Sequence, residues 1–202
     1  MDGLEDPFSH ATRGEVPAMA GNEGQPPAVG YAPGYGNQGC QKPEWGDTIT
    51  AMPQSLARVV LHVVFSTKNR VPFLRDAAVR ARMHAYLAGV LQHIGCNPIL
   101  VNGVEDHVHI LCNLSRTVPI AQLVEEAKKA TSKWMKEQGP EYRDFFWQGG
   151  YGAFSVSQSK VEPVRAYVAR QEEHHHKVTF QDEFRALCRK HGIEIDERYV
   201  WD

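Results

Sequence analysis

The chain has 202 residues, of which 42% are hydrophobic and 23% are charged, and its formal net charge is −2 at pH 7. This length suffices for one sizeable core, and no apolar run approaches the roughly 18 to 20 residues that span a bilayer. The acidic N-terminus lacks the basic and then apolar layout of a secretory signal. We therefore expect a cytoplasmic protein with no membrane partner.

Residues 1–51 differ in composition from the rest of the chain. They hold 15 Gly or Pro residues and seven acidic but only two basic side chains, without helical or strand periodicity. We expect a disordered extension there, and we hypothesise that the native product starts at Met52, where the composition changes. Residues 52–202 carry 20 basic and 17 acidic side chains, a mild positive charge that permits a nucleic-acid partner.

The four cysteines indicate a reducing compartment. Cys40, Cys96, Cys112 and Cys188 show no C-x-x-C spacing. Cys96 and Cys112 stand in apolar surroundings, which is typical of reduced cysteines in a core.

The first half of the folded part predicts a strand, a helix and a hairpin. Residues 58–66 are β-branched and aromatic, and a polar turn closes them, as in a buried strand. Apolar residues at helical spacing from Val79 to Ile94 predict a helix that ends near Gly95. Residues 97–104 and 107–114 read as two strands joined by a tight turn at Glu105 and Asp106.

The order of elements predicts the fold class. Pro119 opens a second amphipathic helix, and residues 154–157 favour a fourth strand. The order β-α-β-β-α-β is typical of the α+β ferredoxin-like arrangement, or split βαβ, in which an antiparallel sheet carries helices on one face. A further C-terminal helix over residues 160–175 carries Tyr167 and, one turn later, Gln171.

The end of the chain is the least informative part. A short helix from Phe180 through Cys188, a stop at Gly192 and an extended segment at 193–201 are expected. We place one domain at 52–177 and a tail at 178–202, and the residues of this tail indicate no chemical role.

His107 and His109 are the first candidates for chemistry. Two residues apart on a strand, their imidazoles lie on one face and supply two ligands of a divalent-metal site that needs a third. Two exposed histidines on an alternating strand are the simpler alternative. The run His174–His176 is interpreted as a solvated helix end, because consecutive helical residues point in different directions.

Three segments resemble the HUH nucleases, and among them the single-tyrosine transposases of small bacterial insertion sequences and their REP-associated relatives. These are G-V-E-D-H-V-H-I-L at 103–111, the strand and basic turn at 62–70, and A-Y-V-A-R-Q at 166–171. The resemblance implies that Tyr167 attacks a phosphate of single-stranded DNA, with His107, His109 and Gln171 holding Mg²⁺ or Mn²⁺.

The resemblance also implies partners. They are DNA hairpins at the ends of the element and a second copy of the chain, in a homodimer that is nucleoid-associated when active. If the tyrosine helices are exchanged between subunits, the glycine-rich stretch at 149–152 is the flexible link. The alternative for Tyr167 is a purely structural role, as a half-buried aromatic side chain on a helix.

The residue types suit phosphoryl transfer for reasons independent of the family. A cation on the non-bridging oxygens relieves charge repulsion toward the nucleophile. A phenol, with a pKa of about 10, needs such help at neutral pH. A 5′-phosphotyrosine retains the energy of the phosphodiester and frees a 3′-hydroxyl, which permits strand exchange without ATP.

Basic side chains are candidates for phosphate contacts. They are Lys68 and Arg70 after the first strand and Lys128, Lys129 and Lys133 on the second amphipathic helix, although a solvated helix face is their alternative reading. Asp106 either orients a ligand imidazole or closes the hairpin turn.

Three functions stay open from the sequence. The first is a single-stranded DNA endonuclease and strand transferase that works in transposition. The second is a domesticated nuclease that uses the same residues to cut repeated palindromes in its host genome. The third is a non-catalytic nucleic-acid-binding module, which predicts aromatic residues on the middle strands where this chain has His107 and His109.

Overall fold

The computed structural model describes residues 56–201 of the chain. The expectations for residues 1–51 and for a start at Met52 lie outside the described residues. The strands are β1 (Val59–Ser66), β2 (Asn97–Gly103), β3 (His107–Leu114) and β4 (Gly152–Val156). The α-helices are α1 (Ala77–His93), α2 (Ile120–Lys136), α3 (Val161–Ala169), α4 (Gln171–His175) and α5 (Phe180–Lys190), and the 3₁₀ turns are η1 (Lys68–Arg70), η2 (Pro140–Tyr142) and η3 (Gln158–Lys160).

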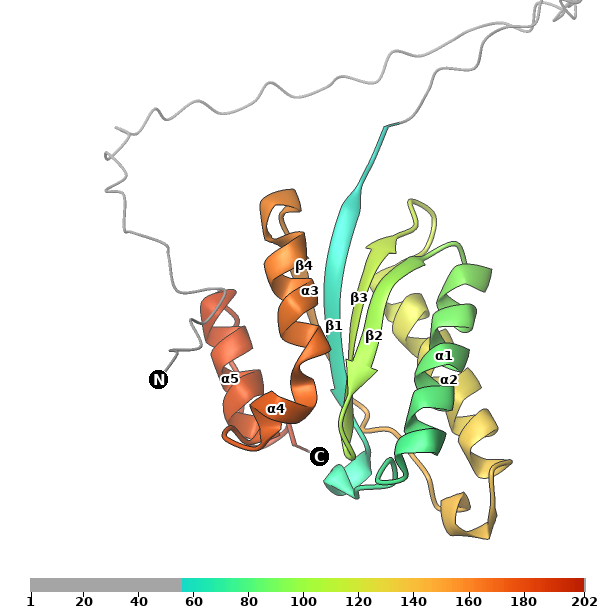
Figure 1. Cartoon of the computed structure of the whole chain (residues 1–202). Helices are drawn as coiled ribbons and strands as arrows, with labels where there is room; N and C mark the ends of the chain where they lie inside the picture. The colour runs from blue at the N-terminus through green and yellow to red at the C-terminus, as the bar shows by residue number, and fades with distance from the viewer. Residues whose placement is uncertain (1–55, 202) are drawn as a thin grey trace, which may run out of the picture. The chain divides into compact units, whose positions relative to one another are not determined.

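The strands form one antiparallel sheet in the order β2-β3-β1-β4. With α1 between β1 and β2 and α2 between β3 and β4, this is the ferredoxin-like arrangement, so the predicted fold class is confirmed. Helices α1 and α2 cover one face of the sheet, as Figure 1 shows on the right of the strands. The two central strands, β1 and β3, are therefore hydrogen-bonded on both sides and form a rigid support.

Side-chain alternation divides β1 and β3 between two cores. Leu61 and Val63 of β1, with Val108 and Ile110 of β3, face α1 and α2 and belong to the larger core. The intervening residues point to the opposite face, where the predicted histidines of β3 lie. Period-2 patterning thus places an apolar layer under one face and the candidate chemistry on the other.

Local signals set the first helices. The side chain of Asp76 accepts hydrogen bonds from the backbone N–H groups of Ala78 and Val79, and so caps the N-terminus of α1. Pro119 stands immediately before α2, where its missing N–H costs nothing. The predicted bounds of these two helices and of the four strands agree with the structure to within about two residues.

Helices α3 and α5 cover the second face of the sheet, to the left of the strands in Figure 1. Val164 and Val168 of α3 pack with Leu111 of β3. Phe184 of α5 belongs to a separate cluster with Val64 of β1. The sequence did not predict that these helices form a second layer. They cover the otherwise open face of the sheet, so that a buried site lies beneath the two helices.

The single helix predicted over residues 160–175 is wrong, because it is broken at Arg170. Asn102, which pairs with His109 in the sheet and so shares its face, reaches the end of α3. Its amide nitrogen donates to the carbonyls of Val168 at 2.8 Å and Ala169 at 3.1 Å. In a continuous helix these two carbonyls would accept hydrogen bonds from backbone N–H groups four residues further along the chain. Here the Asn102 side-chain amide is the donor instead, and the chain changes direction into α4.

The tail is partly as expected. A short helix, α5, is present and ends near Gly192, which has a φ of 65°. The expected extended segment at 193–201 is wrong, because residues 197–201 form turns and Val200 and Trp201 pack against the α5 cluster. Among the described residues, no helix has the length and apolar character needed to cross a membrane.

Candidate active site

His107 and His109 lie side by side on β3, both fully buried beneath the second helical layer. Their ring centroids are 5.1 Å apart. Gly103 allows the tight hairpin before them, because a Cβ at this position would collide with the carbonyl oxygen of His107. Because β3 is hydrogen-bonded to β1 on one side and β2 on the other, the backbone that carries the two imidazoles is fixed along both edges.

Asp106 orients the first imidazole. Its Oδ1 lies 2.7 Å from Nδ1 of His107, so that nitrogen carries the hydrogen and Nε2 is left with its lone pair. Burial lowers the pKa of His107 to about 4, against an upward pull from Asp106. The ring is consequently neutral at pH 7, which is the form that ligates metals.

His62 of β1 supports the second imidazole. Its Nε2 lies 2.9 Å from Nδ1 of His109, and the two rings are stacked. Burial and the neighbouring His109 lower the pKa of His62 to about 3. When Nδ1 of His109 donates to the neutral His62, the Nε2 lone pair of His109 faces the site.

Tyr167 and Gln171 meet at this site even though a helix break separates them. The Tyr167 ring centroid lies 6.1 Å from that of His109 and 6.2 Å from that of His62. Gln171 is fully buried. The Tyr167 hydroxyl and Nε2 of Gln171, the latter at 3.1 Å, both donate to Oε1 of Glu183. The expectation that Tyr167 and Gln171 are neighbours is confirmed, and Glu183 is their common acceptor.

Glu183 on α5 and His175 on α4 were missed in the sequence. The interpretation of 174–176 as a solvated end is wrong for His175, because only 12% of its side chain is exposed, although His176 is exposed. One signal was available: Phe180, Phe184 and Leu187 form the apolar face of α5, and Glu183 falls on that face. A carboxylate in an apolar stripe needs a buried partner.

The donor set fits a divalent cation. Among the described residues, one ligand atom from each of His107, His109, His175 and Glu183 lies within 4.8 Å of the others. Nε2 of His107, Nε2 of His109 and Oε1 of Gln171 are buried and make no hydrogen bond to a described residue. Buried polar atoms without partners are rare, and these three belong to the ligands that the resemblance implied. A cation between them would satisfy all three.

Comparison with known families decides the class of protein. The model described as "Transposase IS200 like" matches residues 55–171, more than half of the chain. The chain belongs to the IS200-like transposase family. The resemblance to single-tyrosine transposases is thereby confirmed. The match ends at Gln171, so both His175 and Glu183 lie beyond it.

Solved structures give distant similarities. A protein from Deinococcus radiodurans R1 with a provisional transposase name is 19% identical, with a TM-score of 0.47 over 61% of this chain and 98% of that chain. A REP-associated tyrosine transposase bound to a REP hairpin is 11% identical, with a TM-score of 0.44 over 64% of this chain and 74% of that chain. No curated protein matches the chain.

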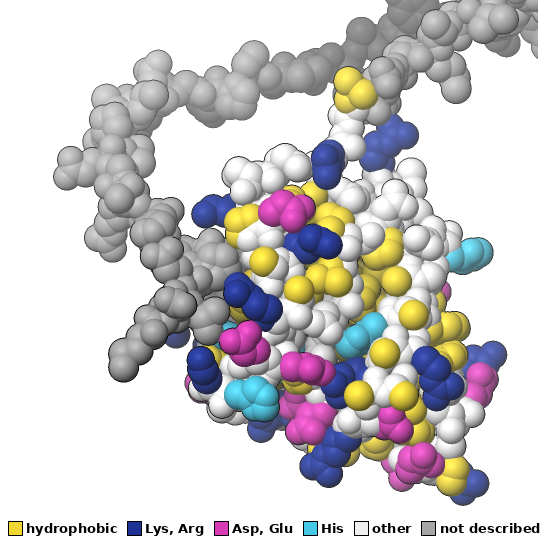
Figure 2. Space-filling model, in the orientation of Figure 1, with side chains coloured by type: hydrophobic (Ala, Val, Ile, Leu, Met, Phe, Trp, Pro, Cys, Tyr) yellow, Lys and Arg dark blue, Asp and Glu magenta, His cyan; other side chains and the backbone are white. Residues whose placement is uncertain are grey.

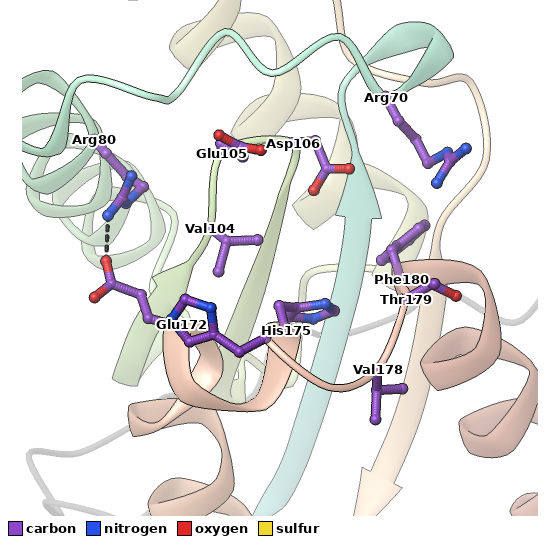
Figure 3. Close-up of a pocket in the computed structure, with 11 residues that line it drawn as sticks. Arg70, Arg80, Val104, Glu105, Asp106, Glu172, His175, Val178, Thr179 and Phe180 are labelled. Atoms are coloured by element: carbon purple, nitrogen blue, oxygen red, sulfur yellow. Dashed lines mark hydrogen bonds and ion pairs between the residues drawn. The ribbon is translucent and has the colours of Figure 1, made fainter.

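A cavity of about 540 Å³ lies beside the site of this IS200-like protein. Of the four residues of the ligand cluster, His175 lines the cavity, and so does Asp106, the hydrogen-bond partner of His107. In Figure 3, Arg70 and Arg80 stand on opposite sides of the cavity, and Arg80 is paired with Glu172. The cavity therefore extends from two guanidinium groups to the outer side of the ligand cluster, at His175.

The predicted phosphate-binding residues of this family member are not all at the site. Lys68 and Arg70 lie in η1, and Arg70 lines the cavity. Lys129, paired with Glu125, and Lys133 lie on α2, across the sheet from the histidines. Figure 2 shows basic and acidic side chains interspersed on the face in view, without a single basic patch.

Lys128 has a structural role. Its ammonium donates to the carbonyls of Gln148 at 2.6 Å, Gly149 at 3.1 Å and Gly150 at 2.7 Å. These three bonds use all three donors of the group, and Nζ also lies 5.0 Å from the centroid of the Phe65 ring. No donor is left for a DNA phosphate, so the sequence-based assignment of Lys128 is not retained.

Proposed function

We propose that the protein is a metal-dependent endonuclease and strand transferase that acts on single-stranded DNA, with Tyr167 as the nucleophile. His107, His109 and Gln171 would hold the cation. The observation that carries the proposal is the convergence of the Tyr167 hydroxyl with three buried ligand atoms that have no hydrogen-bond partner among the described residues. Family membership supports the same chemistry.

The proposed reaction is one transesterification. Oη of Tyr167 attacks the phosphorus of a phosphodiester, the Oη–P bond forms, and the P–O3′ bond breaks. The product is a 5′-phosphotyrosine with a free 3′-hydroxyl, which receives its proton from water. The phenol proton departs along the hydrogen bond to Oε1 of Glu183. A bound divalent cation supplies charge neutralisation on the phosphate oxygens.

The remaining residues position and protect this chemistry. Asp106 and His62 hold the two imidazoles with Nε2 toward the site, and burial keeps the rings of His62 and His107 neutral. Arg70 on the cavity rim is placed to attract a polyanion toward the site. Because the phosphate must enter through a cavity, we propose an unpaired strand as the substrate rather than a continuous duplex.

The structure disfavours the non-catalytic binding module. Such a module offers an open sheet whose central strands present aromatic residues to bases. Here α3 and α5 cover that face, and His62, His107 and His109 are buried beneath them. A sheet whose binding face is filled by its own helices has no platform for stacked bases.

Two parts of the proposal concern partners. Hairpins at the element ends are proposed as the recognised DNA, and a homodimer as the working form. One chain already brings Tyr167, Gln171 and both histidines of β3 together, so exchange of the tyrosine helix is not needed to complete the site. Light scattering of the full chain with and without a DNA hairpin tests the dimer.

The decisive experiment looks for the covalent intermediate. The full chain is incubated with labelled single-stranded DNA from the flanks of its gene and Mg²⁺ or Mn²⁺, and the products are run on a denaturing gel. We expect an adduct that maps to Tyr167 and disappears with EDTA. Binding without an adduct, for every end sequence and both metals, would refute the catalytic proposal.

A further inference from the structure

Glu183 is a buried carboxylate supplied by a helix that lies outside the family match. The match ends at Gln171, whereas α5 begins at Phe180. Glu183 is only 3% exposed, on the face of α5 that packs toward the sheet. Burying an ionised carboxylate is costly unless cations or donors surround it, so its partners are informative.

One oxygen of this carboxylate faces the imidazoles. Oε2 lies 3.0 Å from Nε2 of His175, 3.4 Å from Nε2 of His109 and 3.8 Å from Nε2 of His107. Ligands bound at about 2.0 to 2.2 Å from one ion lie roughly 3 to 3.5 Å apart in octahedral or tetrahedral geometry. The four atoms are thus spaced much like the ligands of a single ion.

The hydrogen positions strengthen this reading. Because Nδ1 of His107 gives its hydrogen to Asp106, Nε2 of His107 presents a lone pair toward Oε2 of Glu183. A lone pair facing a carboxylate oxygen is two acceptors without a donor. A cation between the two atoms removes that conflict, and it also uses the Nε2 atom of His109.

The other oxygen of Glu183 faces the nucleophile. Oε1 accepts from the Tyr167 hydroxyl and from Nε2 of Gln171. Because the Gln171 side chain donates through Nε2, its Oε1 is available as a ligand. Glu183 thereby contacts the candidate cation ligands through one oxygen and the Tyr167 phenol through the other.

We propose that the C-terminal helices complete the cation site of this transposase, with Glu183 Oε2 and His175 Nε2 joining His107, His109 and Gln171 as ligands. This inference rests on the proposed function, because it concerns the same cation. Five protein ligands leave one position of a six-coordinate ion for a phosphate oxygen. Three imidazoles in the set favour Mn²⁺ over Mg²⁺, which prefers oxygen ligands and retains its water.

The test measures binding of Mn²⁺ alone to the full chain, without DNA, from the electron paramagnetic resonance signal of the free ion. We expect Glu183→Gln to weaken Mn²⁺ binding by about tenfold or more. Glu194→Gln is the matched control, because Glu194 is an exposed carboxylate of the same tail, and it should bind as the parent does. Parent-like affinity in Glu183→Gln would overturn the inference.

A second variant covers the case in which Glu183→Gln fails to fold. His175→Gln removes a ligand that is partly exposed, and His176→Gln, at the exposed neighbour, is its control. With Co²⁺ as a probe, loss of a ligand changes the visible absorption spectrum, which a distant packing defect would not do. Unchanged affinity and an unchanged Co²⁺ spectrum in His175→Gln would refute the assigned ligand set.

The same titration separates this inference from the proposed function. His109→Ala removes a ligand common to both and should abolish tight Mn²⁺ binding. If the parent chain itself binds no Mn²⁺, the metal-dependent function fails. If the parent binds and His109→Ala does not, while Glu183→Gln and His175→Gln bind normally, only the contribution of the C-terminal helices is wrong.

Discussion

The Tyr167 hydroxyl donates its hydrogen bond to Glu183, sixteen residues further along the chain. Burial alone would raise the pKa of Glu183, but its surroundings outweigh burial and hold that pKa below its usual range, in part through the hydrogen bond with His175. The acceptor is therefore a carboxylate at neutral pH. The candidate nucleophile is held in place by an ionised side chain from a different helix.

Tyr167→Phe tests the nucleophile and this contact together. We expect no covalent adduct and DNA binding within a fewfold of the parent, because only the hydroxyl is lost. The free energy of unfolding should fall by about 1.5 to 3 kcal/mol, as for a hydrogen bond to a charged group. Tyr199→Phe, at a residue that is 69% exposed, should change neither property. An adduct that persists in Tyr167→Phe rules out this tyrosine.

Asn102→Ala tests the break between α3 and α4. Two carbonyls at the end of α3 lose their donor, so we expect the free energy of unfolding to fall by about 1 to 3 kcal/mol. Adduct formation should slow, because the junction positions both Tyr167 and Gln171. Chemical denaturation and a time course of the adduct measure the two effects. Asn97→Ala, at an exposed position of the same strand, is the control. Equal behaviour of the two variants would contradict the capping role.

Asp106→Asn tests the orientation of His107. A neutral amide is a weaker acceptor for Nδ1–H, or turns its NH₂ donor toward that nitrogen, so the ring can turn or change tautomer, and such supporting contacts are typically worth 10- to 100-fold in metal affinity. We expect a loss of that size in Mn²⁺ titrations. Glu105→Gln makes the same chemical change one residue earlier, at an exposed side chain paired with Arg75, and should bind Mn²⁺ normally. If both variants bind like the parent, Asp106 merely closes the turn.

Acid should destabilise the metal-free protein. The pKa values of His62 and His107 are lowered from 6.5 to about 3 and about 4, mainly by burial. Below pH 6.5 these two histidines bind protons in the unfolded chain, whereas in the folded chain they stay neutral until the pH approaches their lowered pKa values. The free energy of unfolding therefore falls with pH, by about 1.4 kcal/mol per pH unit for each such histidine. The pKa of Glu183 is also lowered, and this shift adds to the loss only below about pH 4.5.

Urea denaturation in EDTA at pH 7, 6 and 5 measures this slope. His62→Gln should flatten the slope between pH 6 and 5 by roughly one proton, whatever its effect on absolute stability. A slope that does not change in the variant would mean that His62 titrates normally in the folded state.

Lys128→Met separates folding from DNA binding. The loss of three carbonyl contacts should lower the free energy of unfolding by about 1 to 3 kcal/mol. The salt dependence of DNA binding should stay that of the parent, whereas losing one phosphate contact on a single strand would reduce the slope by about 0.7. Lys133→Met, at an exposed position of the same helix, serves as the stability control. A reduced salt slope with normal stability would restore a phosphate role for Lys128.

Local patterns were sufficient for much of the fold. Alternation in residues 107–114, and the tight turn before them, predicted both the strand and the shared face of His107 and His109. This inference succeeds because the backbone geometry of a strand fixes which nearby residues share a face. Spacing along one helix also predicted that Tyr167 and Gln171 are neighbours, but the helix is broken between them, so their meeting at Glu183 depends on the tertiary structure.

Other features depend on contacts between distant residues. The end of α3 is decided by Asn102, which stands 66 residues before Val168. The sequence groups the lysines of α2 as one set of candidate phosphate contacts. In the structure, however, Lys128 donates to the carbonyl of Gln148 in the segment after η2, and Lys129 and Lys133 lie across the sheet from the site. No local pattern carries that information, because it depends on how the sheet and helices stack.

The sequence by itself determined the ferredoxin-like order of elements, for which periodicity is sufficient. Its resemblance to the single-tyrosine transposases implied the four residues expected to carry the chemistry, His107, His109, Tyr167 and Gln171. Only the tertiary structure decided that His62 supports His109 and that α5 brings Glu183 into contact with Tyr167. The physical reason is burial, since a carboxylate and neutral imidazoles acquire their partners and their shifted pKa values only when separate elements enclose them.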